Sequence, residues 1–270
     1  MKRIAAVLGM ALMAMPVAAQ DNTGLDRLTR RDQLLGWEAV GRIDIAEGGF
    51  CTGALIATDL VLTAGHCVLG PDGTAIDAAR MTFRAGLADG EAVAEVAVQA
   101  TVVHPDYRIS GGVAALALDV ALLKLATPIP AAVAAPFSVD TPGNGDKVSV
   151  VSYAKGRDAA LSWQKVCTVL GKQAGLIAVD CDVTFGASGA PVLDRSFGRA
   201  RIVSIISSGY RDGDDTVAFG MALPGLVGEL KAMLRQGKAV SSAADGAAPA
   251  IRRIGAADAS RDTGARFVKP

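Results

Sequence analysis

The sequence predicts an all-β protein whose folded part ends with one helix. Short runs rich in Val, Ile, Leu and Ala alternate with Gly, Pro, Asp and Asn, which is typical of many short strands joined by turns. These runs cover 39–45, 53–56, 60–62, 93–103, 121–125, 148–153, 176–179 and 201–207. One segment, 223–235, instead places apolar residues at helical spacing. We therefore expect a sandwich or barrel closed by a single amphipathic helix.

The first 19 residues have the form of a secretory signal peptide. Lys2 and Arg3 precede an apolar run over 4–15, and small residues near position 19 suit a cleavage site. The run is too short and wrongly flanked for a membrane span, and no later run is long enough to cross a bilayer. The alternative to a signal peptide is that these residues form a buried N-terminal helix. We expect a secreted or periplasmic protein with no membrane partner.

The rest of the chain divides by composition. Residues 20–35 are polar and charged, which indicates a short pro-segment or a loose N-terminal arm. Residues 238–270 contain almost no large apolar side chains, so we expect a disordered tail. Lys plus Arg and Asp plus Glu both number 27, and this balance does not indicate a nucleic-acid partner.

Four cysteines in an exported chain predict two disulfides. Three connectivities are open, and we expect the local one, which pairs Cys51 with Cys67 and Cys167 with Cys181. Each bridge would stabilise the fold by roughly 3 kcal/mol in the chain-entropy model. A metal site is the competing interpretation, but neither pair has the short Cys-x-x-Cys spacing of a zinc site. No metal is expected.

Two histidines are the candidates for a catalytic base. A serine nucleophile needs an imidazole to take its proton, and that imidazole needs an acceptor on its other nitrogen. His66 lies beside Cys67, whose disulfide would fix the His66 loop. His104 precedes Pro105 and lies in a predicted turn.

Ser188 and Asp119 are the candidates for the other two roles. Gly186 and Gly189 flank Ser188 and let the backbone turn, so that the N–H groups of Gly186 and Ser188 can point at one oxyanion. Asp119 opens the apolar run 120–125, and a buried carboxylate there needs a partner such as an imidazole. Taken alone, Ser188 and Asp119 could equally be ordinary turn residues.

In the order His66, Asp119, Ser188, the chain resembles the trypsin and chymotrypsin-like serine proteases. Leu-Thr-Ala-Gly-His-Cys at 62–67 is similar to the histidine motif of that family. Asp-Val-Ala-Leu-Leu at 119–123 and Gly-Ala-Ser-Gly-Ala-Pro-Val at 186–192 are similar to its aspartate and serine motifs. The resemblance runs from about residue 36 to 235. Within the family, the chain looks most similar to the secreted bacterial glutamyl endopeptidases.

The resemblance implies two six-stranded antiparallel β-barrels with a cleft between them. The first barrel would cover 36–135, and the second, with the C-terminal helix, 136–237. His66 would act as general base and acid, Asp119 would orient it, and Ser188 would form the acyl-enzyme, while Gly186 and Ser188 would supply the oxyanion hole. His104 would be structural. The implied substrate is a protein or peptide, no cofactor is required, and we expect a monomer.

Two other functions compete with a protease. One is a catalytically silent, protease-shaped binding protein, although all three triad residues are present. The other is an esterase of the α/β-hydrolase type, but the Gly-x-Ser-x-Gly elbow and the chain order Ser, Asp, His do not occur here.

The sequence departs from trypsin at the position before the nucleophile. Trypsin-type enzymes carry an aspartate there, which captures the new N-terminal ammonium on activation, whereas this chain has Ala187. We therefore expect the substrate pocket to form without a free N-terminus.

Cleavage specificity is open between basic residues and small or apolar ones. Asp182 lies six residues before Ser188, where trypsin-like enzymes place the aspartate that binds Arg or Lys. Ser204 is expected at the pocket wall, and Ile205 and Ile206 after it would narrow that wall. Glutamate specificity is disfavoured because it uses a further histidine that the chain lacks.

Overall fold

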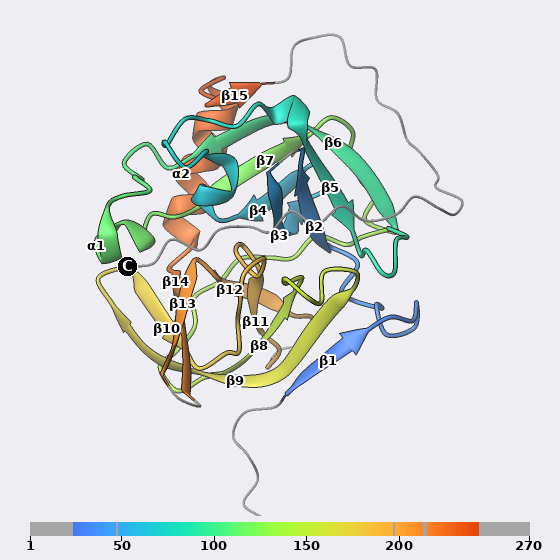
Figure 1. The fold of residues 1–270 in the computed structure, drawn as a ribbon, viewed down its shortest axis with the longest axis vertical. Coiled ribbons are helices and arrows are strands. Elements are labelled where there is room, and N and C mark those ends of the chain that lie inside the picture. The colour runs from blue at the N-terminus through green and yellow to red at the C-terminus, as the bar shows by residue number, and fades with distance from the viewer. Residues whose placement is uncertain (1–23, 47, 197, 213–214, 243–270) are drawn as a thin grey trace, which may run out of the picture.

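Two antiparallel β-sheets follow one another along the chain (Figure 1). The structure is a computed structural model that describes residues 24–46, 48–196, 198–212 and 215–242. The predicted signal peptide, 1–19, lies outside the described residues, and so does most of the predicted tail, from 243 to 270.

The first sheet closes into a barrel. Its strands run in the order β6-β5-β2-β3-β4-β7, and β6 also pairs with β7, which joins the two ends of the sheet. The strands are β2 (Val40–Ile45), β3 (Gly49–Ala57), β4 (Leu60–Thr63), β5 (Met81–Ala85), β6 (Ala94–Val103) and β7 (Ala121–Leu125). The predicted six-stranded first barrel is therefore confirmed.

The second sheet differs from the predicted closed six-stranded barrel. Seven strands follow the order β12-β11-β8-β9-β10-β14-β13, and no ladder joins β12 to β13 among the described residues. Beyond the end of β12, the Ser207 N–H donates to the Phe219 carbonyl of β14 at 2.8 Å. This side of the sheet is therefore joined by a single backbone hydrogen bond and not by a ladder. The strands are β8 (Lys147–Ser152), β9 (Leu161–Gln173), β10 (Leu176–Val179), β11 (Pro191–Asp194), β12 (Arg201–Ile205), β13 (Ser208–Asp212) and β14 (Asp215–Met221).

The predicted C-terminal helix is present as α2 (Pro224–Arg235). Pro224 occupies the first turn, where the missing N–H costs nothing, and Val227 and Leu230 are buried. A five-residue helix, α1 (Gly112–Leu116), was not expected because so short a segment shows no periodicity. Within the described residues, neither helix is long and apolar enough to cross a bilayer.

The segment before the first barrel is not a loose arm where it is described. Strand β1 (Leu25–Leu28) pairs antiparallel with β9 of the second sheet. Leu28 and Leu34 are buried, and the ring of Trp37 lies 5.2 Å from the ring of Trp163. Hydrophobic burial therefore holds this segment against the second sheet, although its polar composition indicated otherwise.

The first residues of the predicted tail are also ordered. Strand β15 (Ser241–Ser242) pairs with β6, and the Val240 N–H donates to the Thr101 carbonyl at 2.9 Å. The predicted start of disorder at residue 238 is thus wrong for 238–242. Backbone hydrogen bonds to an open strand edge need no apolar side chains, so composition did not reveal them.

Candidate active site

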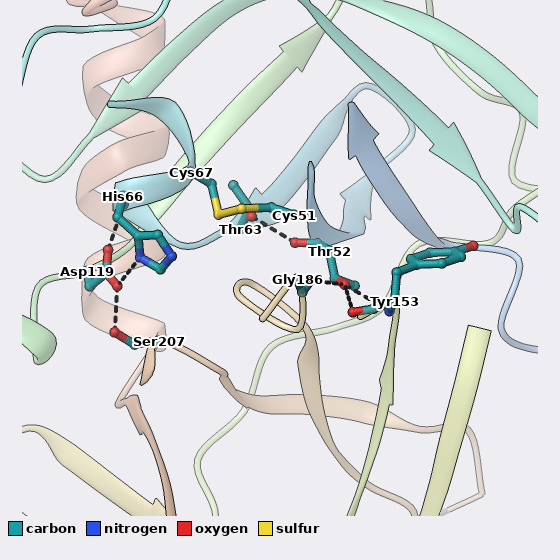
Figure 2. The surroundings of a disulfide bond; sticks show 9 residues. All are labelled: Cys51, Thr52, Thr63, His66, Cys67, Asp119, Tyr153, Gly186 and Ser207. Atoms are coloured by element: carbon teal, nitrogen blue, oxygen red, sulfur yellow. Dashed lines mark hydrogen bonds and ion pairs between the residues drawn. A yellow bond between two sulfur atoms is a disulfide. The ribbon is translucent and has the colours of Figure 1, made fainter. Parts of the chain in front are cut away.

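His66 lies in a single turn of 3-10 helix, η1 (Gly65–Val68), directly after β4. The neighbouring Cys67 forms a disulfide with Cys51 of β3, and Cys167 forms one with Cys181, so the local pairing is the one observed. The first disulfide ties the turn that carries His66 to the barrel wall (Figure 2).

Asp119 holds the imidazole of His66 in place. Its Oδ2 lies 2.7 Å from His66 Nδ1, and its Oδ1 accepts a hydrogen bond from the His66 backbone N–H at 2.8 Å. The Asp119 side chain is 1% exposed. One carboxylate therefore orients both the ring and the backbone of His66, and it leaves Nε2 as the nitrogen free to act on a substrate or a nucleophile.

Ser207 is a third partner of this pair, and sequence reasoning missed it. Its hydroxyl donates to Asp119 Oδ2 at 2.5 Å, and the residue is buried (Figure 2). The hydrogen bond gives the buried carboxylate one more donor, which offsets the cost of removing the charge from water. The sequence feature that could have indicated this partner is the run Ser207-Ser208-Gly209, which follows the end of β12.

Ser204, predicted at the pocket wall, lies elsewhere. It is buried on β12, and its hydroxyl donates to the Met221 carbonyl at 3.0 Å. Ile205 and Ile206 have no exposed surface, so they pack in the core and cannot narrow a substrate pocket. Three serines stand within five residues here, and strand register decides which of them faces Asp119.

Burial and charge oppose each other in the pKa values of the pair. Burial alone would lower the pKa of His66, but the charge of Asp119 and its hydrogen bond raise it above 6.5. For Asp119, burial would raise the pKa, whereas the charge of His66 and the hydrogen bonds from His66 and Ser207 lower it. The carboxylate is therefore ionised near neutral pH, and its charge favours a proton on the imidazole.

The loop that carries Ser188 packs against the strands that lead to His66. The Thr52 N–H donates to the Ser188 carbonyl at 2.9 Å, and the Thr52 hydroxyl donates to the Gly186 carbonyl at 3.0 Å. A Cβ on Gly189, whose φ is +76°, would lie 2.1 Å from Thr63 Oγ1, so only glycine fits there. Ser188 thus lies beside Thr52 of β3 and Thr63 of β4.

No hydrogen bond joins Ser188 Oγ to His66 Nε2 in the described part of the chain. Such contacts are often long in a ligand-free site and tighten when substrate binds.

Two backbone donors beside Ser188 are unused. Among the described residues, the N–H groups of Gly186 and Ser188 have no hydrogen-bond acceptor, whereas the Ala187 N–H between them donates to the Thr184 carbonyl at 3.0 Å. Gly186 has a φ of +91°, a conformation that favours glycine. Unused N–H groups on either side of a turn are suited to bind an anionic oxygen.

Asp182 begins the same loop. It is half-buried, and its backbone N–H donates to Gln164 Oε1 on β9 at 2.7 Å. His104, predicted to be structural, has its Nε2 at 3.4 Å from Glu229 Oε2 of α2, and its backbone N–H donates to the Val120 carbonyl.

One group of side chains in the described part of the chain could by its geometry hold a metal ion. It consists of Cys51, His66 and Cys67, whose three ligand atoms lie within 4.8 Å of one another. The two sulfur atoms are joined to each other, however, and a metal-binding cysteine must be a free thiolate. These residues therefore do not fit a metal in the disulfide-bonded protein.

Comparisons with known proteins bear on the family and the fold of the chain. The family model of the trypsin-like peptidase domain matches residues 51–200. The chain is similar in fold to the solved structure of a Glu endopeptidase in complex with MPD. The TM-score is 0.66 with 21% sequence identity, over 79% of this chain and 97% of that one. A comparison with curated proteins gave no match.

Proposed function

Because the chain belongs to the trypsin-like peptidase family, we propose that it is an exported serine endopeptidase that acts through Ser188, His66 and Asp119. The observation that carries the proposal is the contact of 2.7 Å between His66 Nδ1 and the buried Asp119 carboxylate. The Ser188 loop is hydrogen-bonded to β3, the strand that the Cys51–Cys67 disulfide joins to the His66 turn, which supports the same conclusion.

In the first half of the reaction, Ser188 Oγ attacks the peptide carbonyl while His66 Nε2 takes the hydroxyl proton. The Asp119 carboxylate keeps the Nδ1 proton in place and stabilises the imidazolium that forms. The carbonyl oxygen becomes an oxyanion, which the N–H groups of Gly186 and Ser188 can bind. One such donor is worth about 3 kcal/mol of transition-state stabilisation in other enzymes. His66 then returns the proton to the departing amine, and an acyl-enzyme remains on Ser188.

In the second half, His66 takes a proton from water, and the resulting nucleophile attacks the acyl carbonyl. Collapse of this intermediate releases the carboxylic acid and returns the proton to Ser188 Oγ. No cofactor enters either half. The signal-like N-terminus and the two disulfides support an extracellular or periplasmic site of action.

Covalent labelling tests the proposal directly. A fluorophosphonate probe should label the wild-type protein at one serine, and Ser188→Ala should abolish the label. His66→Ala should slow labelling by at least about 10⁴-fold, because the base is lost. Ser196→Ala, at an exposed serine eight residues further on, is the matched control and should label like the wild type.

The rate at which each variant hydrolyses a denatured protein substrate should change in the same direction as its rate of labelling. Labelling that persists in Ser188→Ala would contradict the proposal. A wild-type protein that neither labels nor hydrolyses would favour the silent binding protein instead.

A further inference from the structure

Three side chains that carry metal-ligand atoms meet beside the proposed catalytic base. The sulfur atoms of Cys51 and Cys67 and a ring nitrogen of His66 all lie within 4.8 Å of one another. Figure 2 shows the His66 ring between the Asp119 carboxylate and the two sulfur atoms. Thiolate sulfur and imidazole nitrogen are the ligands that Zn²⁺ prefers in structural protein sites. The bond between the two sulfur atoms is what keeps this group from binding zinc.

The spacing of the three atoms is close to that of a zinc site. Zn–S bonds of about 2.3 Å and Zn–N bonds of about 2.0 Å place the ligand atoms of a tetrahedral zinc roughly 3.5 Å apart. Once the sulfur–sulfur bond is broken, atoms that start within 4.8 Å of one another need to move by only about 1 Å to reach a common ion. Rotation of the cysteine side chains covers such a distance.

Asp119 provides the further contact that a zinc-binding histidine requires. Its Oδ2 lies 2.7 Å from His66 Nδ1, and its side chain is 1% exposed. Metal-ligating histidines almost always donate their other ring N–H to a carboxylate or a carbonyl, which fixes the tautomer and makes the ligating nitrogen more basic. Because Asp119 occupies Nδ1, Nε2 is the nitrogen that a metal ion takes.

Contacts other than the disulfide hold the two cysteines near each other. Cys51 lies on β3, which pairs with β4, and the last residue of β4, Thr63, donates its hydroxyl to the carbonyl of the residue after Cys51 at 2.8 Å. The turn with Cys67 follows β4, and the His66 backbone N–H in that turn donates to Asp119 Oδ1 at 2.8 Å. We therefore expect the turn to keep its place when the sulfur–sulfur bond is reduced.

The second disulfide has no comparable neighbours. In the part of the chain that the structure describes, no histidine or carboxylate completes a three-ligand group with Cys167 and Cys181. Both of these cysteines are buried, as Cys51 and Cys67 are. The Cys167–Cys181 pair is therefore a matched control for effects of reduction that do not involve a metal.

We propose that reduction of the Cys51–Cys67 disulfide creates a Zn²⁺ site formed by the two thiolates and His66 Nε2, and that zinc bound there inactivates the protease. The inactivation rests on the proposed function, because it requires His66 to be the base, whereas the binding of zinc does not. A dithiol reductant gives two electrons and two protons to the disulfide, becomes a disulfide itself and leaves both cysteines as thiols.

Zinc then displaces the two thiol protons to water, and water completes its fourth position. The Nε2 lone pair that takes the Ser188 proton during catalysis is bound to the metal, so the nucleophile is no longer activated. Oxidation of the two thiolates back to the disulfide removes two of the three protein ligands and releases the ion. The protease is thus inactive where dithiols and zinc are present and becomes active when the disulfide forms.

The zinc content of the full chain tests the site directly. Both cysteines are 2% exposed, so the thiol form is made by folding the chain with dithiothreitol, which is then removed without oxygen. After dialysis against dilute Zn²⁺ and then buffer, this form should hold about one zinc ion per chain, and the oxidised protein should hold almost none.

Paired cysteine variants are the controls for zinc content. In the reduced state, Cys167→Ala with Cys181→Ala should bind zinc like the wild type, whereas Cys51→Ala with Cys67→Ala should bind almost none. Equal zinc in the oxidised and reduced wild type, or zinc retained without Cys51 and Cys67, would overturn the proposal.

Cobalt(II) shows which side chains hold the metal. In the reduced wild type, Co²⁺ should give thiolate charge-transfer absorption and the visible bands of a tetrahedral site. Asp119→Asn should weaken binding by about 10–100-fold because the imidazole loses its second contact, and His66→Ala should weaken it at least as much. Unchanged affinity in both variants would indicate chelation by the cysteines alone and would overturn the site.

Thermal unfolding shows whether the reduced chain is folded when it binds the metal. Zn²⁺ should raise the melting temperature of the reduced wild type and leave that of the oxidised protein unchanged, because the ligands are brought together only in the folded state. A reduced chain that fails to fold both with and without zinc would overturn the proposal.

Fluorophosphonate labelling connects the site to activity. The reduced, zinc-loaded wild type should label at least about tenfold more slowly than the same protein after a chelator has removed the zinc. Zinc bound at these residues without slower labelling would overturn the inactivation. A wild type that labels in no state would overturn the proposed function, whereas zinc content and the cobalt spectrum would still decide whether the metal site exists.

Discussion

At the scale of single residues, Asp119 has the most constrained role in the site. It is almost fully buried and accepts hydrogen bonds from the His66 backbone, the His66 ring and Ser207. Asp119→Asn keeps the shape of the side chain but replaces one acceptor oxygen by an amide donor. An amide donor facing Nδ1 favours the His66 tautomer with its proton on Nε2, which cannot act as the base. We expect kcat to fall by about 10⁴-fold, as the same change does in a related triad.

Peptide hydrolysis and the rate of fluorophosphonate labelling measure this effect, with the melting temperature as a check that the variant folds. A fall of less than about tenfold in kcat would show that Asp119 does not orient the base.

The pH dependence of activity follows from the raised pKa of His66. The base must be neutral, so activity is lost as pH falls through that pKa and the ring takes up a proton. Because Asp119 raises the pKa above 6.5, the midpoint of the acid limb of kcat should lie above 6.5. The stabilisation that folding gives to the protonated ring is complete below the unfolded pKa and disappears as pH rises through the folded one. An acid limb centred below 6.5 would contradict the assignment.

At the scale of elements, the Cys51–Cys67 disulfide joins β3 to the turn that carries His66. It closes a segment with a sequence separation of 16, for which the chain-entropy model gives a stabilisation of roughly 3 kcal/mol. We expect Cys51→Ala with Cys67→Ala to lower the free energy of unfolding by about this amount, as measured by urea denaturation.

The second disulfide provides the matched control. Cys167 and Cys181 have a sequence separation of 14, so their removal should cost a similar amount. Activity measured well below the melting temperature should fall more for the first pair, because only that pair fixes the turn beside His66. Equal activity losses in the two variants would contradict this role.

The elements also show where prediction from sequence succeeds. Strands such as β7 and β12 were anticipated because short apolar runs bounded by turn residues are typical of strands. The sequence analysis named no serine as a partner of Asp119; it placed Ser204, three residues before Ser207, at the pocket wall. Only the pairing of β12 with β11, and the turn after it, determines that Ser207 faces Asp119 and Ser204 faces Met221.

At the scale of the whole molecule, the segment before the first barrel belongs to the fold. Strand β1 pairs with β9, and Leu28 and Leu34 are buried against the body of the protein. Burial of one leucine contributes about 1.5–3 kcal/mol. A variant that begins at Gly36 should therefore lose about 3 kcal/mol or more of unfolding free energy relative to one that begins at Gly24.

Urea denaturation of the two lengths checks this expectation, and equal stabilities would contradict it. Acetylation of the N-terminus in the longer form should leave activity unchanged, because Ala187 provides no carboxylate for a terminal ammonium. Activity that appears only with one particular free N-terminal residue would contradict the second expectation.

Three local motifs predicted the chemistry available to this protein: one histidine in a turn next to a disulfide, an aspartate opening a strand and a serine flanked by glycines. Local motifs carry that information because side-chain type and backbone freedom are properties of a few neighbouring residues. Only the folded structure shows which serine supports Asp119 and that the N-terminal segment joins the second sheet. These contacts join residues 88 to 139 positions apart, and they depend on strand register and burial, which no local pattern encodes.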